Sequence, residues 1–313
     1  MKTSRLYIES MAYAGDPAAW TGDALVWPRN TSPEKERLRK YPTRRLDAMA
    51  GYAVKASLQA VAACDIPDDV VPSLGVISLS HNGPCIFCED FYRDLITEPD
   101  PRLVSPSFFA ESVLNIVTTH ISLALKTRVP AYAFNAALDD FFTVLDTTFL
   151  LVRAKQFERG VLAFSEEFSG LARELIASCK QLPGSAFGNG ALAWVFSAAP
   201  ESGSRPGLYI EASQSSDTTE EAVTALSALQ RDRGTRIVRS AFSVPEHVLF
   251  KALPDSVDDP VISVQAMDSE QMFHVLRAAE VAALLTQMPV GSETALVQAT
   301  PNGVRWLVTG HSA

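Results

Sequence analysis

Two short segments of the sequence have residue types and spacings that could do chemistry. The first contains Cys85 and Cys88, two residues apart, with His81 four positions before Cys85. Such a pair with a nearby histidine occurs in zinc sites and in dithiol redox sites. A zinc site would need a second pair of ligands, and four cysteines are few for 313 residues. We therefore interpret Cys85 and Cys88 as packed thiols near a strand end, and expect no metal ion and no cofactor.

The second segment is a strand-to-helix corner. The run Ala131-Tyr132-Ala133-Phe134-Asn135 predicts a strand, which leads through Ala136-Ala137-Leu138-Asp139-Asp140 into a long apolar helix. A strand, a tight corner of small residues and a helix form a nucleophile elbow, where a reactive side chain is placed at the corner. Asp139 and Asp140 would lie at the helix N-terminus, where the helix dipole favours negative charge. We therefore interpret these two as solvated charges rather than as a catalytic carboxylate pair.

The elements that must position these segments alternate between strands and helices. Apolar runs predict strands at 6–11, 74–80, 160–164 and 190–196, and helical spacing predicts helices at 44–63, 91–96 and 108–126. A thinner version of the pattern follows, with strands at 207–212, 236–239, 261–264, 295–299 and 304–309 and helices at 220–231 and 272–288. The last two strands are joined by Pro301-Asn302-Gly303, which favours a hairpin. This alternation predicts an α/β fold.

Composition excludes several classes of protein. With 47% hydrophobic and 20% charged residues the chain is globular, and the Pro- and Gly-containing stretch 197–206 divides it into halves at 1–196 and 197–313. A net charge of −9 argues against nucleic acid as the partner, because phosphate binding needs clustered Lys and Arg. The one basic cluster, between Lys35 and Arg45, is a solvated face or a docking patch for an acidic partner. Without a signal-like amino terminus or a membrane-length apolar run, we expect a cytoplasmic protein with no membrane partner.

Several further motifs occur in a distinctive order. They are Pro106-Ser107-Phe108-Phe109, Asn115, His120-Ile121-Ser122, Arg128-Val129-Pro130, the small-residue corner, and Phe187-Gly188-Asn189-Gly190-Ala191. In this order they resemble the amino-terminal half of β-ketoacyl-ACP synthases of the thiolase fold, over residues 44–196 and in outline beyond. The nearest type is the chain-length-factor partner of a ketosynthase, as in aryl polyene and type II polyketide pathways. The resemblance implies a layered αβαβα fold with a shortened carboxy-terminal half.

The resemblance also implies that catalytic residues are missing. A ketosynthase carries a cysteine at the corner, where its thiolate accepts the acyl chain from a carrier-protein thioester, but the matching residue is Leu138. The first of two expected histidines would fall near Leu253, and the lysine that precedes the second is replaced by Ser269. The second histidine matches His274, a remnant that cannot run a condensation alone. The chain is thus expected to be a pseudoenzyme.

Two sets of residues are implied to face a partner. Phe109, Ser112 and Ile116 share one face of the predicted helix 108–126, with Phe108 beside them. In the family this helix start lies at the dimer interface and reaches the acyl tunnel of the other subunit, so these residues would limit chain length; core packing is the alternative. By the same resemblance, the strand Ala131, Tyr132, Ala133, Phe134 and Asn135 would pair with its counterpart across the dimer.

The function that the resemblance implies is that of a non-catalytic subunit. It would form a heterodimer with an active ketosynthase, shape its acyl tunnel, and meet the acyl carrier protein that bears the growing chain in polyketide, polyene or fatty-acid-like biosynthesis. One alternative is a stand-alone thiolase-fold acyl hydrolase or transferase with another nucleophile, although no Gly-x-Ser-x-Gly elbow occurs. A homodimeric scaffold is a second alternative.

Overall fold

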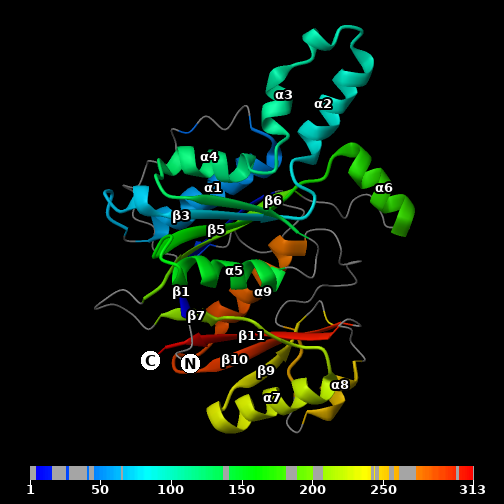
Figure 1. Ribbon diagram of the computed structural model, residues 1–313. Coiled ribbons are helices and arrows are strands. Elements are labelled where there is room, and N and C mark those ends of the chain that lie inside the picture. Colours follow the sequence, from blue (N-terminus) through cyan, green and yellow to red (C-terminus); the bar gives the residue numbers. More distant parts are fainter. Residues whose placement is uncertain are drawn as a thin grey trace.

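The structure is a computed structural model, which describes residues 5–15, 26–27, 41, 46–64, 66–136, 141–180, 189–199, 207–240, 243, 247–253, 257–260, 273–300 and 303–312. Figure 1 shows helices and sheet in alternating layers, with helices outside, sheet beneath them, and further helices between the two parts of the sheet. This arrangement confirms the predicted α/β class and its αβαβα layering. The predicted strand at 261–264 and the basic cluster at 35–45, apart from Tyr41, lie outside the described residues.

The described strands join into one mixed sheet. They are β1 (Arg5–Gly15), β2 (Val26–Trp27), β3 (Gly75–Ser80), β4 (Ala131–Asn135), β5 (Arg159–Glu166), β6 (Gly190–Ser197), β7 (Leu208–Glu211), β8 (Gln214–Ser216), β9 (Arg236–Arg239), β10 (Glu293–Thr300) and β11 (Gly303–His311). Their order is β4-β3-β5-β6-β1-β7-β11-β10-β9, with β2 beside β1 and β8 beside β11. β3 is parallel to both β4 and β5, so the carboxyl ends of these three strands point the same way and lie close together. β1 is antiparallel to β6 and to β7, and thereby connects the two parts of the sheet.

The helices cover both outer faces and fill the middle. They are α1 (Ala48–Ala63), α2 (Cys85–Thr97), α3 (Pro106–Glu111), α4 (Ile116–Leu125), α5 (Phe141–Arg153), α6 (Gly170–Lys180), α7 (Thr219–Arg233), α8 (Val248–Ala252) and α9 (Phe273–Gln287), with short 3-10 helices η4 (Val71–Ser73) and η5 (Pro101–Leu103). In Figure 1, α1 and α4 cover one outer face, α7 and α8 cover the other, and α5 and α9 lie between. No helix among the described residues is long and apolar enough to cross a membrane.

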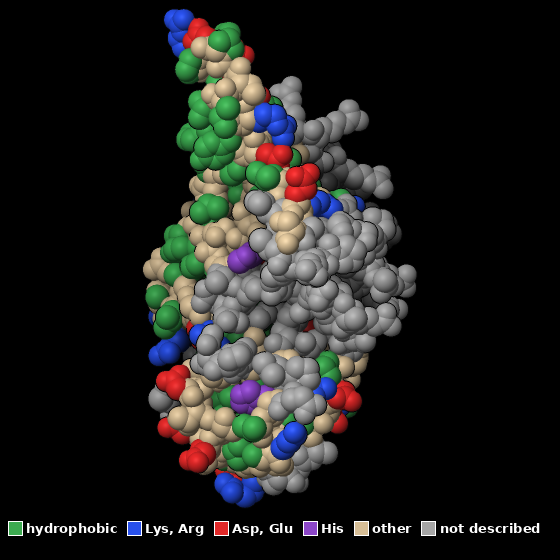
Figure 2. Space-filling model, turned by 90° about the vertical axis from the view of Figure 1, so that its right-hand side faces the viewer, with side chains coloured by type: hydrophobic (Ala, Val, Ile, Leu, Met, Phe, Trp, Pro, Cys, Tyr) green, Lys and Arg blue, Asp and Glu red, His purple; other side chains and the backbone are tan. Residues whose placement is uncertain are grey.

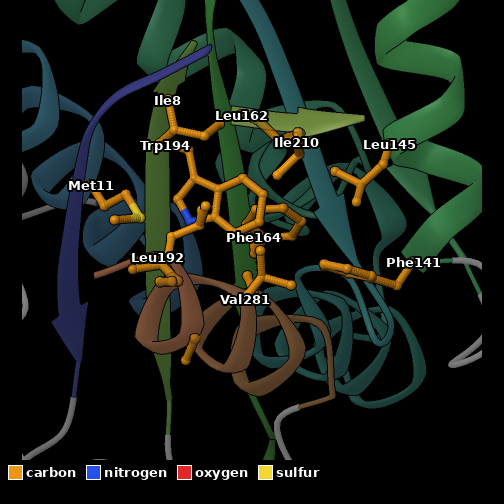
Figure 3. Close-up of a cluster of buried hydrophobic side chains, with 14 of the residues drawn as sticks. Ile8, Met11, Phe141, Leu145, Leu162, Phe164, Leu192, Trp194, Ile210 and Val281 are labelled. Carbon is orange, nitrogen blue, oxygen red and sulfur yellow. The ribbon is translucent and has the colours of Figure 1, made fainter. Parts of the chain in front are cut away.

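The cores follow from the two-residue period of the strands. Leu162 and Phe164 of β5 point into the central layer, while Val161 and Ala163 point toward α1 and α4, because successive side chains of a strand lie on opposite faces. Figure 3 shows Trp194 of β6 packed among the central side chains, with its ring centroid 4.8 Å from that of Phe164. Strands buried on both faces explain the unbroken apolar runs in the sequence.

One predicted helix is divided in two. The pattern predicts a single helix over 108–126, whereas α3 ends at Glu111 and α4 begins at Ile116. The hydroxyl of Ser112 donates to the carbonyl oxygen of Phe109 at 2.9 Å, and a serine bonded to nearby backbone competes with helix continuation. The prediction that Phe109, Ser112 and Ile116 share one helix face is therefore wrong.

Candidate functional site

Polar groups gather where the three parallel strands end. The backbone N–H of His81, directly after β3, donates to the Glu166 carboxylate at 2.8 Å, and the N–H of Asn82 donates to it at 3.4 Å. Nδ1 of His81 lies 3.0 Å from the carbonyl oxygen of Ala136, and the Asn135 side-chain amide donates to the His81 carbonyl oxygen at 2.8 Å. The contacts of His81 with Asn135 and Ala136 thus hold the chain that leaves β4 toward Leu138 against the end of β3.

Glu167 connects the first turns of two helices. Its carboxylate accepts the backbone N–H of Met49 in α1 at 3.1 Å and that of Ile86 in α2 at 2.8 Å. First-turn N–H groups have no partner within their own helix and carry the positive end of the helix dipole, so a carboxylate is a favourable acceptor there. Glu166 and Glu167 are both fully buried. Within the described part of the chain, neither carboxylate is paired with a Lys or Arg side chain.

Burial without a cation shifts the titration of these acids. Burial raises the pKa of Glu166 to about 8. It also raises the pKa of Glu167 to about 8, with a further contribution from the charge of Asp47. Asp47 caps α1 through the N–H of Ala50, and burial raises its pKa to about 6. The three carboxyl groups therefore exchange protons near neutral pH.

These acids are not among the residues expected at a site from the sequence. The available signal is small: Ser165-Glu166-Glu167 continues a buried apolar strand without an intervening turn residue. Acidic residues that directly continue such a strand lie at the carboxyl end of the strand, which is where ligand sites form in α/β folds.

The cysteine pair lies in the first turn of α2. The thiol of Cys85 donates to the carbonyl oxygen of Glu167 at 3.2 Å and accepts from the N–H of Ser169 at 3.0 Å. The thiol of Cys88 donates to the carbonyl oxygen of Ser112 at 3.3 Å. Burial, with the nearby Glu167 charge, raises the pKa of Cys85 to about 12, so this side chain stays a thiol rather than a nucleophilic thiolate. These contacts fit the interpretation of packed thiols at a strand end.

The structure describes only some of the expected catalytic positions. Leu138 and Ser269 lie outside the described residues. His274 is the second residue of α9, whose buried residues such as Val275 belong to the central core. Leu253 is only 7% exposed and packs in the outer core formed by α7, α8 and the strands β9 to β11. The structure therefore puts Leu253 and α9 in different cores.

Asp139 and Asp140, at the corner, also lie outside the described residues. The described flanks of the corner are Asn135 and Ala136 on one side and Phe141 on the other. Phe141 is buried against Phe164, with ring centroids 5.4 Å apart, so α5 starts in the central core.

α2 and α3 form an arm that projects from the body of the molecule (Figures 1 and 2). The ring pairs Phe87–Phe108 and Phe91–Phe109, with centroids 5.7 and 5.6 Å apart, hold the two helices together. Figure 2 shows hydrophobic side chains along one side of the arm. The exposed large apolar residues of the arm are Tyr92, Leu95, Ile96, Leu103 and Phe109. Clustered exposed apolar side chains mark interaction surfaces.

The residues expected to limit chain length separate into two environments. Phe108 and Phe109 lie on the arm, and Phe109 is 58% exposed. Ile116 is only 5% exposed and packs in the core beneath α1, so its environment is that of a core residue. Ser112 lies at the base of the arm, where its carbonyl oxygen accepts the Cys88 thiol.

The strand expected at a dimer interface lies at the edge of the sheet. β4 pairs with β3 on one side and with no described strand on the other. Ala131 and Asn135 are exposed, and Tyr132, Ala133 and Phe134 are half-buried. On the neighbouring helix α4, Leu123 is exposed as well. An edge strand presents unpaired N–H and C=O groups and is a ready template for another strand.

The complete fold is similar to several solved structures. One is a chain of the ishigamide ketosynthase/chain length factor, with a TM-score of 0.67 and 14% identity over 98% of this chain and 99% of that chain. Another belongs to AntDE:AntF, a type II PKS acyl-carrier protein in complex with its ketosynthase, with a TM-score of 0.72 and 13% identity over 99% of both chains. A third belongs to the ketosynthase ApeO in complex with its chain length factor ApeC from Xenorhabdus doucetiae, with a TM-score of 0.52 and 15% identity over 99% of this chain and 100% of that chain. The chain has the thiolase-type fold of ketosynthases and chain length factors.

This ketosynthase-like fold confirms the architecture that the sequence resemblance implies. No family model matches the sequence, and no curated protein is significantly similar to it. At 13–15% identity the likeness concerns the fold. Function therefore depends on the residues that this chain carries at the corner, the edge strand and the arm.

Proposed function

We propose that this protein is a non-catalytic, chain-length-factor-like subunit that forms a heterodimer with an active ketosynthase and shapes its acyl tunnel. One observation carries the proposal. β4 ends at Asn135, α5 begins at Phe141, and the sequence between them, Ala136-Ala137-Leu138-Asp139-Asp140, contains no thiol. A leucine can neither attack a thioester nor hold an acyl group. A ketosynthase-like fold without its nucleophile suits a partner subunit.

The similar structures support both proposed partners. One holds a ketosynthase with an acyl-carrier protein, and one holds a ketosynthase with its chain length factor. By analogy, this chain would bind a ketosynthase, and the pair would receive acyl groups from a carrier protein. A polyketide, aryl polyene or fatty-acid-like pathway would supply the growing chain.

The proposed interface uses the edge strand and the arm. β4, residues 131–135, would pair with the corresponding strand of the ketosynthase, and its open edge supports this role. Phe108 and Phe109 would border the acyl tunnel and form a gate that limits chain length. Ser112, at the end of α3, and Ile116, at the start of α4, would support these two side chains. The exposure of Phe109 supports contact with a partner, because burial of a phenylalanine side chain stabilises an interface by about 1.5–3 kcal/mol.

The gate is tested by the substitution Phe109→Ala in the co-expressed complex. Removal of the ring should lengthen the products by at least one extension unit, because a bulky side chain at the tunnel end opposes further methylenes at about 1–3 kcal/mol. Product length is measured by mass spectrometry. Leu150→Ala, on the exposed side of α5, is the control and should leave product length unchanged. Unchanged product length with Phe109→Ala would contradict the gating role of Phe109, but not the proposal that the chain is a partner subunit.

The non-catalytic role is tested by Leu138→Cys in the chain without a ketosynthase. We expect no condensation, because Ser269 replaces the lysine that the mechanism needs and a cysteine alone does not restore it. Acyl loading is followed by intact-protein mass after addition of an acyl carrier protein thioester. Measurable acyl loading or decarboxylation by this single variant would contradict the proposal.

A further inference from the structure

We propose that the α2–α3 arm and the turn at residues 126–128 form one docking surface, which binds the ketosynthase subunit at both ends of β4. The arm would lie on the turn that ends the partner's equivalent of α4, and the turn of this chain would receive the partner's arm. The inference rests on the proposed function, because it takes the partner to be a ketosynthase of the same fold. It adds which segments meet and by what chemistry.

The helices of the arm have no interior of their own. None of the residues of α2, η5 or α3 is buried. The arm nonetheless carries large apolar side chains, and those of Ile96 and Leu103 are 81% and 69% exposed. Monomeric proteins rarely leave a large group of apolar side chains in water. The arm therefore needs another surface to cover it.

The exposed apolar surface continues from the arm to the open edge of the sheet. Leu114, which follows α3, is 54% exposed. Its Cδ2 lies 2.9 Å from the position that a Cβ of Gly83 would occupy, and the side-chain nitrogen of Asn135 lies 3.4 Å from the same position. Asn135 ends β4, which has no described neighbour on its outer side. Figure 2 shows hydrophobic side chains on the same side of the arm and of the body below it, so one partner can cover both.

Strand pairing determines what lies opposite the arm. Two equivalent edge strands make equivalent hydrogen bonds in an antiparallel ladder, which a two-fold axis relates. The arm leaves the sheet after β3, beside Asn135 at the carboxyl end of β4. The turn 126–128 precedes the amino end of β4, and the strand separates these two ends by about 13 Å.

An antiparallel pair therefore brings the partner's corresponding turn beside the arm of this chain. By the same symmetry, the partner's arm comes beside Lys126 and Arg128. Figure 1 shows that α4, which ends at Lys126, lies on the side of the sheet from which the arm projects. The arm and the partner's α4 end are thus at the same level above the paired sheets.

The two parts of the docking surface carry opposite charge. Residues 85–111 contain six acidic and two basic side chains. Both basic ones, Arg93 and Arg102, are paired with acids of the arm itself. The turn carries Lys126 and Arg128, which are both exposed. An acidic arm on a basic turn is the arrangement that electrostatic complementarity favours.

The partner's matching surface therefore has a defined chemistry. It should offer an apolar patch for Ile96 and Leu103, and basic side chains in the turn before its edge strand. A second copy of this chain carries the same turn and is the competing occupant. One of the similar structures pairs a ketosynthase with its chain length factor, which favours the ketosynthase.

The first test is hydrogen–deuterium exchange of the full chain, alone and in the purified complex with the neighbouring ketosynthase. Residues 85–111 and 126–130 should both gain protection of at least about tenfold in the complex, because contact with the partner suppresses local opening. Peptides of α7, on the opposite outer face, are the internal reference and should keep their protection.

Variants test the chemistry of each part through the affinity for the ketosynthase, measured by biolayer interferometry. Ile96→Ser combined with Leu103→Ser should weaken binding at least about tenfold at low and at high salt, because apolar burial is lost. Lys126→Glu combined with Arg128→Glu should weaken binding about tenfold at low salt and less at high salt, because ions screen exposed charges.

Two control variants match these substitutions. Val248→Ser, on the outer face at α8, replaces an apolar side chain that is 61% exposed. Lys155→Glu reverses the charge of an exposed lysine with nearly the same backbone as Lys126, with φ angles of 55° and 57°. Both should bind as the wild type does. Circular dichroism verifies folding, and the exchange measurement on the wild type does not depend on the variants.

The outcomes separate this inference from the proposed function. A heterodimer in which either segment gains no protection, or in which either double variant binds as its control does, would overturn the docking surface and leave the partner role standing. A wild-type chain that forms no complex with the ketosynthase, or only a homodimer that the ketosynthase does not displace, would overturn both.

Discussion

Glu211 and Glu293 contrast with Glu166 and Glu167, although all four are acids withdrawn from water. Glu211 and Glu293 lie where β1 meets the carboxy-terminal strands, and Arg233 donates to both of their carboxylates at distances between 2.6 and 3.1 Å. Arg5 adds contacts of 3.2 and 3.4 Å, and its guanidinium lies 4.0 Å from the ring centroid of Tyr209. Glu166 and Glu167 are held by backbone N–H groups instead.

The contrast lies in how each group is neutralised. Burial acts to raise the pKa of Glu293, but hydrogen bonds from Arg233 and Tyr209 outweigh it and lower the pKa. For Glu166, burial dominates and raises the pKa to about 8. Glu293 therefore keeps its charge throughout the neutral range, whereas the strand-end acids respond to pH. The pH-responsive acids lie beside the corner and the arm, where partner contacts are proposed.

The largest expected effect is the pH dependence of stability that Glu166 confers. The unfolded chain loses this proton near pH 4.5 and the folded chain near pH 8, so the unfolding free energy should fall as the pH rises between these values. Each unit of displacement corresponds to about 1.4 kcal/mol, which gives a decline of a few kcal/mol over the window. Urea unfolding at pH 5, 6.5 and 8.5 measures it.

Glu166→Gln should reduce the slope by the share of Glu166, because the amide does not titrate, and Glu167 should keep its own share. Glu293→Gln is the counterpart in the arginine-paired group and should leave the slope between pH 5 and 8.5 intact, since the pKa of Glu293 is lowered. Equal slopes in wild type and Glu166→Gln would show that the two groups of acids do not differ in this way.

The next largest effect is expected for Arg233→Ala at pH 7. Removal of one partner from a buried ion pair costs about 3–5 kcal/mol, and we expect about 2–3 here because Arg5 stays in place and Arg233 is partly exposed. Arg231→Ala is the matched control in the same helix, since its pair with Asp232 is exposed and worth less than about 1 kcal/mol. Similar losses for both variants, measured by urea unfolding, would contradict the importance assigned to this network.

The smallest effect concerns the cap of α1. Asp47→Ala should lower stability by about 1 kcal/mol, because the N–H of Ala50 loses its acceptor. Asp47→Asn keeps the acceptor and removes a buried charge, so it should be no less stable than wild type at pH 8. Thermal unfolding of both variants at pH 8 separates capping from charge; equal destabilisation would mean that the charge is not costly there.

The sequence predicts the sheet better than it predicts the site. β3, β5 and β6 match their predicted spans closely, because continuous apolar runs have few alternatives in an α/β fold. The division of helix 108–126 depends on Ser112, whose carbonyl oxygen contacts Cys88 in another helix. Glu167 reaches Met49 across 118 positions of sequence, a distance at which local pattern carries no information.

The position of Leu253 illustrates the same limit. The resemblance is loose beyond residue 196, and apolar spacing does not tell one buried layer from another. The packing of the two cores shows that Leu253 lies on the outer side of β9 to β11, away from the central layer that holds α9. By contrast, β4 lies at the edge of the described sheet, which leaves it available for the partner strand that the resemblance implies.

The central claim is tested most directly by co-expression with the ketosynthase encoded nearest to this chain, purification through a tag on this chain, and mass measurement of the eluted complex. A ketosynthase from an unrelated pathway is the control. The account predicts a one-to-one heterodimer with the neighbouring ketosynthase and none with the control. A homodimer or monomer that does not bind the neighbouring ketosynthase would contradict it, and would favour a scaffold or a separate acyl-transfer activity.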